Sequence, residues 1–212
     1  SPAPIFAFRL HQFISPGDNL FTSLEAPEVR YVTVNGQQFV PNSRDKVLLP
    51  MVFCRECGQD YYCVSHETAS GTDNEDKFVP RHLSERLVDQ NQVAGYLYND
   101  PNSDWPLYDE AELINRLPED WIEPAPKNAG WRVKKSAKKY IPIPIKVKPD
   151  GTIHNTEGLQ MLFVCTPFTI CLNCGVSYTR RTRSDFGKLT PLGTEGRSTS
   201  TTILSLAGVQ QL

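Results

Sequence analysis

Two short cysteine motifs have the residue types and the spacing of a metal site. Each has the pattern Cys-x-x-Cys-Gly, first at Cys54 and Cys57 and again at Cys171 and Cys174. Two thiolates separated by two residues can bind one metal ion from a single turn, and the glycine after them allows the left-handed backbone that points amide groups back at sulfur. Two such turns supply the four thiolates of a tetrahedral Zn²⁺ site. The sequence therefore predicts one zinc ion bound by these four cysteines.

The competing interpretation is a disulfide-bonded secreted protein, since the chain has six cysteines. Four of the six lie in the two matched turns, and the first residues show no signal-peptide pattern, so we favour zinc. Cys63 and Cys165 lie outside the turns in apolar runs, and we expect them to be small buried residues rather than ligands. A site of four cysteines leaves no position for water, so we expect a structural and not a catalytic ion.

Composition limits the possible functions. The 212 residues are 39% hydrophobic, with a mean hydropathy of −0.39, a net charge of −2 and a pI of about 6.1. This balance does not support electrostatic binding of nucleic acid by the whole chain, although local basic patches remain possible. No segment approaches the roughly 18 consecutive apolar residues of a membrane span. We therefore expect a soluble protein of the cytoplasm.

Apolar runs adjoin both cysteine turns, which indicates that strands position them. Residues 47–53 precede the first turn, residues 60–64 follow it, and residues 161–170 precede the second. Further strands are expected at residues 20–24 and 93–98. Seventeen prolines and thirteen glycines also favour strands and irregular connections over long helices.

Two patterns predict how particular strands are arranged. Asn35-Gly36 separates two β-rich tetrads, residues 31–34 and 37–40, which is typical of a hairpin with a type I′ turn. Residues 140–147 contain two prolines and are therefore expected to form an edge strand, since a central strand would need the missing N–H groups.

Helical spacing is confined to short segments. It occurs in residues 5–14, in residues 109–117 and in a C-terminal segment that follows an N-cap at Ser198 or a neighbouring hydroxyl. The fold class is therefore mainly β with a few short helices (α+β), with a zinc ribbon of the two Cys-x-x-Cys-Gly turns on an antiparallel sheet.

The expected domain organisation has three parts. Residues 1–20 form a connecting segment, residues 21–190 form the β-rich zinc domain with a surface loop near residues 67–76, and residues 191–212 form a loop and a helix. Because that helix is apolar up to Leu212, we expect the chain to be a fragment that leads into a further domain.

Three segments carry a family likeness: FRLHQF at residues 8–13, FCRECGQDYY at residues 53–62 and EGRSTSTT at residues 195–202. In this order they resemble large bacterial DEAD/DEAH-box helicases of superfamily 2, of the kind associated with phage defence or DNA repair. The likeness covers both ends and the first cysteine turn. It does not extend to residues 65–160.

The resemblance implies a zinc-bearing accessory insertion between two RecA-like motor domains of an ATP-binding helicase, with DNA and those motor domains as partners. The phosphate-binding pattern G-x-x-x-x-G-K-[ST] and an acidic Mg²⁺-binding motif are both missing from the 212 residues. The glycines of residues 193–199 have the wrong spacing and no lysine. We therefore expect no ATPase activity from this chain itself.

Basic residues form two clusters that could contact phosphates. The candidates are Arg180, Arg181 and Arg183, which follow the second cysteine turn beside Tyr178, and Lys134, Lys135, Lys138 and Lys139. The alternative for each cluster is an ordinary solvated face. Two functional hypotheses follow: a non-catalytic helicase domain that contacts nucleic acid, or a structural or protein-interaction module in which zinc only stabilises the fold.

Overall fold

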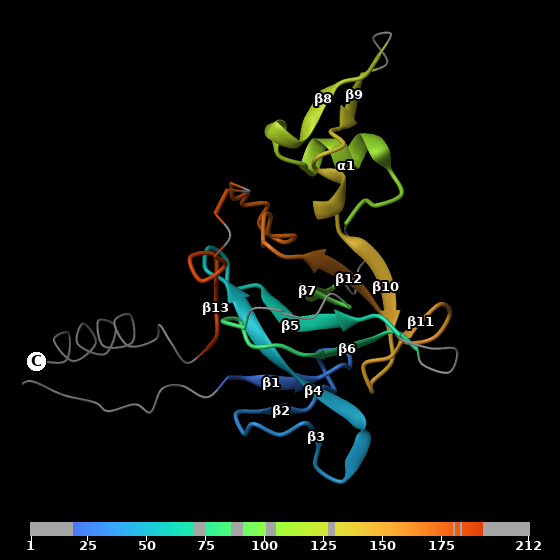
Figure 1. Ribbon diagram of the computed structural model, residues 1–212, viewed down its shortest axis with the longest axis vertical. Helices are drawn as coiled ribbons and strands as arrows, with labels where there is room; N and C mark the ends of the chain where they lie inside the picture. Colours follow the sequence, from blue (N-terminus) through green and yellow to red (C-terminus); the bar gives the residue numbers. More distant parts are fainter. Residues whose placement is uncertain are drawn as a thin grey trace, which may run out of the picture.

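The computed structural model describes residues 19–69, 75–85, 91–100, 105–126, 130–179, 181–182 and 184–192. In this part the protein is mainly antiparallel sheet with one α-helix, in agreement with the predicted α+β class (Figure 1). The helices predicted for residues 5–14 and for the C-terminal segment lie outside the described residues, as do residues 70–74 of the predicted loop.

Eleven strands of the described residues form one sheet. Its strand order is β11-β10-β12-β7-β5-β4-β1-β2, while β3 and β13 also pair with β4 and β6 pairs with β5. The strands are β1 Phe21–Ser23, β2 Val32–Thr33, β3 Phe39–Val40, β4 Ser43–Cys54, β5 Asp60–Glu67, β6 Lys77–Pro80, β7 Gln92–Asn99, β10 Ile143–Val147, β11 Ile153–His154, β12 Leu159–Cys165 and β13 Leu189–Thr190.

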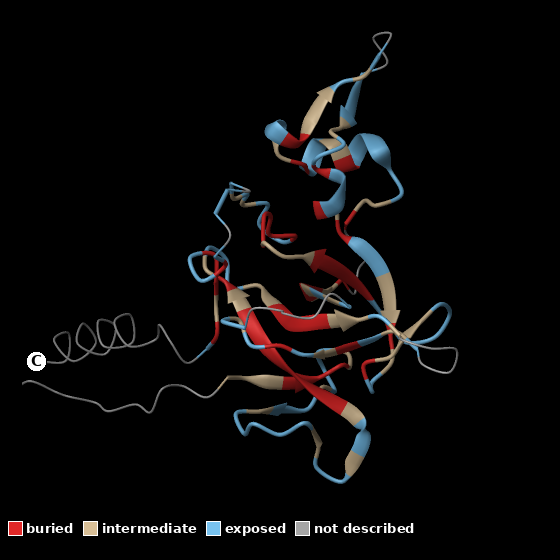
Figure 2. Cartoon of the chain, in the orientation of Figure 1, coloured by how far each residue is buried: buried red, intermediate tan, exposed pale blue. Residues whose placement is uncertain are grey.

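The central strands β4, β5, β7 and β12 are buried on both faces (Figure 2). Successive side chains of a strand point to opposite faces: Tyr61 and Cys63 of β5 enter one core cluster, whereas Tyr62 and Val64 enter the other. This arrangement explains why residues 47–53 are a continuous apolar run instead of an alternating one.

The two core clusters are defined by their buried members. The first comprises Val52, Cys54, Tyr61, Cys63, Tyr96, Trp105, Leu113, Leu117, Trp121, Ala137, Tyr140, Leu162, Val164, Phe168, Ile170, Cys171, Leu172 and Leu189. The second comprises Leu24, Val47, Leu49, Met51, Tyr62, Val64, Phe78, Leu97, Val147, Met161 and Phe163. The cysteines Cys54 and Cys171 therefore belong to the first cluster.

The hairpin predicted around Asn35-Gly36 is wrong. β2 pairs with β1, and β3 pairs with β4, so the two tetrads do not pair with each other. Neither Asn35 nor Gly36 has the positive φ that a type I′ turn requires. The segment turns instead through a hydrogen bond from the Gln37 amide to the Asn35 carbonyl (2.8 Å). Each tetrad pairs with a strand that carries buried side chains, and those pairings exclude the local one.

The proline-containing segment is an edge strand along its first half, as predicted. β10 pairs with β12 along its whole length, but β11 pairs only with Lys146 and Val147. Pro144 therefore lies where β10 has no second neighbouring strand in the described part of the chain. A residue without an N–H group costs no ladder hydrogen bond on that open side.

A small helical module covers one side of the first core cluster. It consists of α1 Glu110–Arg116, the 3-10 helices η1 Glu119–Trp121 and η3 Lys138–Tyr140, and the two-stranded ribbon of β8 Ile122–Pro124 and β9 Trp131–Val133. The Asp109 carboxylate caps α1 by accepting the Ala111 and Glu112 amide hydrogens. This confirms the helix predicted for residues 109–117. Of the helices in the described part, none is long and apolar enough to cross a membrane.

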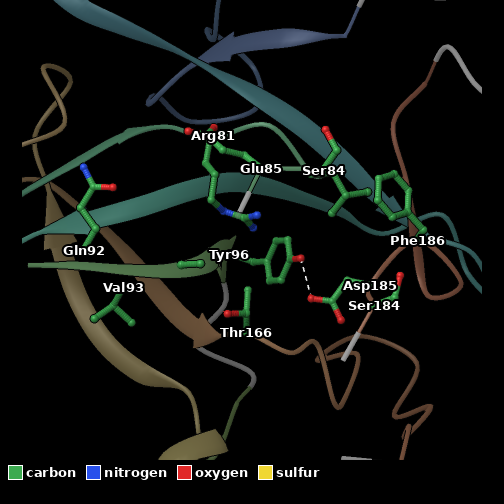
Figure 3. Close-up of a pocket in the computed structure, with 12 residues that line it drawn as sticks. Arg81, Ser84, Glu85, Gln92, Val93, Tyr96, Thr166, Ser184, Asp185 and Phe186 are labelled. Atoms are coloured by element: carbon green, nitrogen blue, oxygen red, sulfur yellow. Dashed lines mark hydrogen bonds between the residues drawn. The ribbon is translucent and has the colours of Figure 1, made fainter. Parts of the chain in front are cut away.

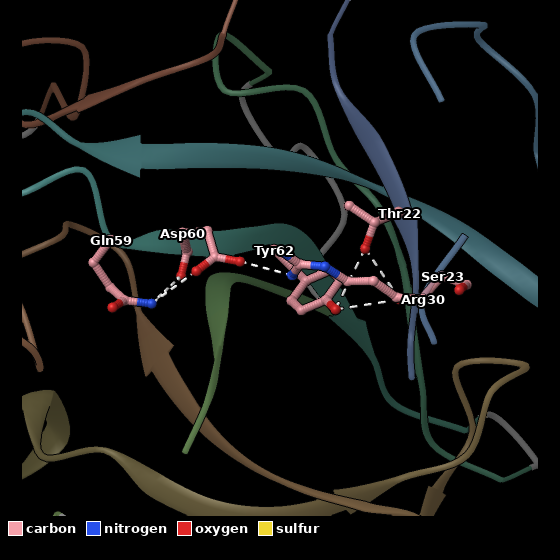
Figure 4. Close-up of polar contacts among 6 residues, drawn as sticks. All are labelled: Thr22, Ser23, Arg30, Gln59, Asp60 and Tyr62. Carbon is pink, nitrogen blue, oxygen red and sulfur yellow. Dashed lines mark hydrogen bonds and ion pairs between the residues drawn. The ribbon is translucent and has the colours of Figure 1, made fainter. Parts of the chain in front are cut away.

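Polar contacts fix the start of β5, which follows the first cysteine turn directly (Figure 4). Arg30 forms an ion pair with Asp60, the first residue of β5 (Nη1–Oδ2, 2.7 Å). The Tyr62 hydroxyl donates to the Ser23 carbonyl (3.2 Å), and the Thr22 hydroxyl donates to Tyr62 (3.4 Å). These contacts tie the β1–β2 connection to the strand that holds the turn in place.

Candidate metal centre

The first cysteine turn connects β4 to β5. β4 ends at Cys54, whose carbonyl accepts a hydrogen bond from the Gly58 amide (2.8 Å). The Cys54 amide in turn donates to the Gln59 carbonyl (2.8 Å). Gly58 has φ +76°, so the left-handed glycine predicted from the sequence is confirmed at this position.

The second cysteine turn repeats this geometry. The Gly175 amide donates to the Cys171 carbonyl (2.9 Å), and the Cys171 amide donates to the Val176 carbonyl (2.9 Å). Gly175 has φ +74°. An isolated bridge between Ile170 and Ser177 closes the base of the turn. The two motifs are therefore one structural unit that occurs twice.

The two turns bring all four predicted cysteines together. The sulfur atoms of Cys54, Cys57, Cys171 and Cys174 lie within 4.8 Å of one another, and those of Cys57 and Cys171 are 3.8 Å apart. Zn–S bonds of about 2.3 Å in a tetrahedron place neighbouring sulfur atoms about 3.8 Å apart. The geometry of the four cysteines is therefore compatible with one zinc ion. Cys63 and Cys165 lie outside this cluster.

Main-chain amides point at three of the four sulfur atoms. Cys54 accepts from the Cys57 and Glu56 amides, and Cys57 and Cys174 each accept from the amide two residues further on. Burial nevertheless raises the pKa of Cys54 to about 12. Burial also opposes ionisation of Cys57, but the Gln59 amide and the Asn173 side chain outweigh it and lower its pKa to about 7. The cluster therefore combines a buried and an easily ionised thiol.

Tyr61 links the two turns. It follows the first turn, yet its hydroxyl accepts a hydrogen bond from the Leu172 amide (2.8 Å) and lies 3.3 Å from the Cys171 sulfur. Burial raises the Tyr61 pKa far above its usual range, so the hydroxyl stays protonated. Since its oxygen accepts from Leu172, its own proton is available for the sulfur of Cys171.

Tyr178 has the same position in the second turn but different contacts. Its ring packs 6.2 Å from that of Phe168, between centroids, in the first core cluster. Its hydroxyl is buried and has no hydrogen-bond partner among the described residues. The two turns thus share their backbone geometry, but of the two tyrosines only Tyr61 forms a hydrogen bond across the cluster in the described residues.

Comparison with known proteins identified no relative of this chain. No family model, no curated protein and no solved structure matches the chain. The site is therefore interpreted from its own residues and geometry.

The predicted phosphate-binding residues occupy unequal environments. Lys134 donates to the Asp120 carbonyl (2.9 Å), and the Lys139 ammonium lies 4.8 Å from the centroid of the Tyr140 ring. The exposed residues of the set are Arg181, Lys135, Lys138 and Lys139, while Arg180 and Arg183 lie outside the described residues. At least one lysine of the cluster therefore has a local structural contact.

Sequence reasoning missed a buried ion pair behind the second turn. Lys188 is 2% exposed, and its ammonium contacts Asp185 (2.9 Å) and the carbonyls of Phe168 (2.7 Å) and Thr182 (3.0 Å). The other Asp185 oxygen accepts from the Tyr96 hydroxyl (2.8 Å). Only the Asp-x-x-Lys spacing hints at the pair, and that spacing is common on protein surfaces.

Proposed function

We propose that Cys54, Cys57, Cys171 and Cys174 bind one Zn²⁺ ion in a structural role, as a zinc ribbon. The approach of four sulfur atoms from segments 114 residues apart, on two turns of equal geometry, is the observation that supports this function. The bound ion would supply four metal–thiolate bonds between the β4–β5 hairpin and the segment after β12. Four protein ligands complete its coordination, so the role we propose is stabilisation and not catalysis.

Metal analysis of the protein purified under reducing conditions tests this function. We expect about one zinc per chain, and its loss in Cys54→Ser and Cys171→Ser, because three thiolates bind zinc more weakly than four. Cys165→Ala is the matched control and should retain the metal, since Cys165 lies outside the cluster. A disulfide within either turn, or four free thiols without metal, would contradict the proposal.

We further propose that the zinc domain is a non-catalytic accessory part of a superfamily 2 helicase that contacts DNA. The resemblance of the sequence to those helicases supports the helicase context. Arg181, Lys135 and Lys138 are exposed, and they form no ion pair in the described part of the chain. Such side chains can bind phosphate without first breaking a salt bridge.

A salt-titrated binding assay with single-stranded and double-stranded DNA tests the second proposal. Affinity should fall steeply with salt, and it should fall further in the combined variant Arg181→Gln, Lys135→Gln and Lys138→Gln. A variant with three charges removed elsewhere, at Arg44, Lys46 and Lys77, is the matched control. Equal losses in both variants would refute contact through the proposed residues.

The alternative is a protein-interaction module. Trp131 is 55% exposed and Tyr108 is 92% exposed, and both belong to the segment that carries α1 and the β8–β9 ribbon. This alternative predicts no DNA binding at low salt by a zinc-loaded, folded protein. The same assay therefore separates the two roles.

A further inference from the structure

Arg81 is buried to an extent that is unusual for a charged residue. It follows β6, is 3% exposed, and points toward Tyr96, whose ring centroid lies 5.2 Å from the guanidinium carbon (Figure 3). Each guanidinium nitrogen donates to a main-chain carbonyl: Nε to Val64 (3.0 Å), Nη1 to His82 (3.3 Å) and Nη2 to Gly95 (3.4 Å). The acceptors of Arg81 in the described residues are thus uncharged: these carbonyl groups and the side chain of Tyr96.

The charge of Arg81 is not paired with a carboxylate of the described residues. A guanidinium has five N–H donors, so the three carbonyl groups and the side chain of Tyr96 leave one donor over. No carboxylate of the described residues lies within 4.0 Å of its nitrogen atoms. A buried cation is costly unless an anion accompanies it. Lys188, the other buried cation among the described residues, has such a partner in Asp185.

The acidic residues near Arg81 are engaged elsewhere. Asp185 accepts hydrogen bonds from Tyr96, from the Phe168 amide and from Lys188, so its charge is already compensated. The Glu85 carboxylate accepts the His82 amide hydrogen (3.1 Å) and belongs to an exposed residue. Arg81 contacts the Tyr96 ring but is therefore the cation without an anionic partner among the described groups at this place.

A cleft of about 880 Å³ opens beside Arg81 and Tyr96. It lies where β12 ends at Cys165, opposite Gly95. After the hydrogen bond from the Thr166 amide to the Ala94 carbonyl (3.0 Å), Gln92 and Val93 of β7 have no strand neighbour on that side in the described part of the chain. Hydroxyl groups of Ser84, Thr166 and Ser184 line it. Apolar side chains of Leu83, Val93 and Phe186 line it as well. Its volume lies within the usual range of small-molecule pockets.

We propose that this cleft binds a small organic anion, a carboxylate or a phosphate ester. The spare Arg81 donor and the nearby hydroxyl groups fit the oxygen atoms of such an anion. Val93 and Phe186, each 45% exposed, provide an apolar surface for the rest of the ligand. A mixture of apolar walls and a few polar groups is typical of ligand pockets. The cleft lining includes none of the four clustered cysteines.

The test is a titration of the zinc-loaded protein with benzoate, phenyl phosphate, inorganic phosphate and benzylamine, followed by ¹H–¹⁵N NMR. Benzoate or phenyl phosphate should shift the amide signals of residues 92–96 and 184–186, and the tighter of the two identifies the preferred anionic group. Benzylamine should leave these signals unchanged. Absence of shifts with both aromatic anions, or equal shifts with benzylamine, would overturn the proposal.

Two variants locate the interaction. Arg81→Gln should weaken binding of the aromatic anions by about tenfold or more, the loss expected for a charge-assisted hydrogen bond. Phe186→Ala should weaken the binding of benzoate but not that of inorganic phosphate. This variant tests the cleft as the binding site if Arg81→Gln does not fold. Arg44→Gln is the control with the same charge change, at an exposed residue outside the cleft. Unchanged benzoate affinity in each folded cleft variant would refute the site.

Discussion

The sulfur atoms of the cysteine cluster have unequal environments. Cys54 is 2% exposed, and burial raises its pKa to about 12, whereas Cys57 is exposed and its pKa falls to about 7. Burial also raises the pKa of Cys174. At neutral pH and without metal, Cys54 and Cys174 are thus protonated, while Cys57 is partly ionised. A zinc ion that binds all four must displace protons.

Zinc uptake should therefore release about two or more protons per ion near pH 7, because Cys54 and Cys174 are thiols before zinc binds and thiolates afterwards. Protons compete with the metal for the sulfur atoms, so zinc affinity is highest above the thiol pKa values and falls as the pH falls. Two protons correspond to about a 100-fold loss of affinity per pH unit. Calorimetric titrations in buffers of different ionisation enthalpy measure the proton count. A pH-independent affinity below pH 7 would exclude thiolate ligands.

Tyr61 and Tyr178 provide a matched pair of substitutions. Tyr61→Phe removes the hydroxyl that lies 3.3 Å from the Cys171 sulfur, and it should weaken zinc binding by about 10- to 100-fold, the usual effect of losing a hydrogen bond to a metal ligand. Tyr178→Phe removes a buried hydroxyl that has no partner among the described residues, and it should leave zinc affinity unchanged. Competition with a chromophoric chelator measures both. Equal losses would show that Tyr178 also hydrogen-bonds a ligand.

At the scale of the elements, the two turns depend on their glycines. An added Cβ at Gly58 would have no atom within 4 Å, so only its φ of +76° opposes a side chain. Gly58→Ala should therefore cost about 1–2 kcal/mol of stability. Gly36→Ala is the control, since Gly36 is equally open but has no positive φ. Urea denaturation at constant free zinc measures the stability of both variants. Equal losses of stability would show that the backbone conformation of Gly58 is not the cause.

The elements that sequence reasoning predicted well are those with strong local signals. The strands at residues 47–53 and 93–98 are apolar runs, and the helix at residues 109–117 has a cap and an apolar face. The hairpin at Asn35-Gly36 failed although its turn signal is strong. β2 and β3 are two residues long and pair with β1 and β4, so distant strands decide their pairing.

The sites differ in the same way: those with local sequence signals were predictable, and those formed by distant segments were not. The cysteine cluster was predictable because its ligands occur in two local motifs with a matched spacing. Nothing local marks Arg81 or the Asp185–Lys188 pair, because their environments arise where β6, β7 and the segment after β12 meet. Burial of a charged residue depends on tertiary contacts, and a single sequence shows only that the residue is charged.

The metal centre and the core are continuous, which determines the response of the whole molecule to metal loss. The first core cluster extends from Cys54 and Cys171 to Trp121, which is 1% exposed and lies in the helical module. Removing the ion would free two turns that are 114 residues apart and expose this shared core.

Chelation should therefore unfold the sheet and the module together. We expect the free energy of unfolding to fall by about 4 kcal/mol or more, the linkage at a thousandfold excess of zinc over its Kd. Urea denaturation followed by tryptophan fluorescence measures the loss, and chelation alone should shift the emission to the red because Trp105 and Trp121 become exposed. Added zinc should reverse the shift in the wild type and in Cys165→Ala, but not in Cys54→Ser. If chelation removes zinc while the emission and the urea midpoint stay constant, the ion does not stabilise this fold, because a metal that is bound only in the native state must contribute its binding free energy to folding.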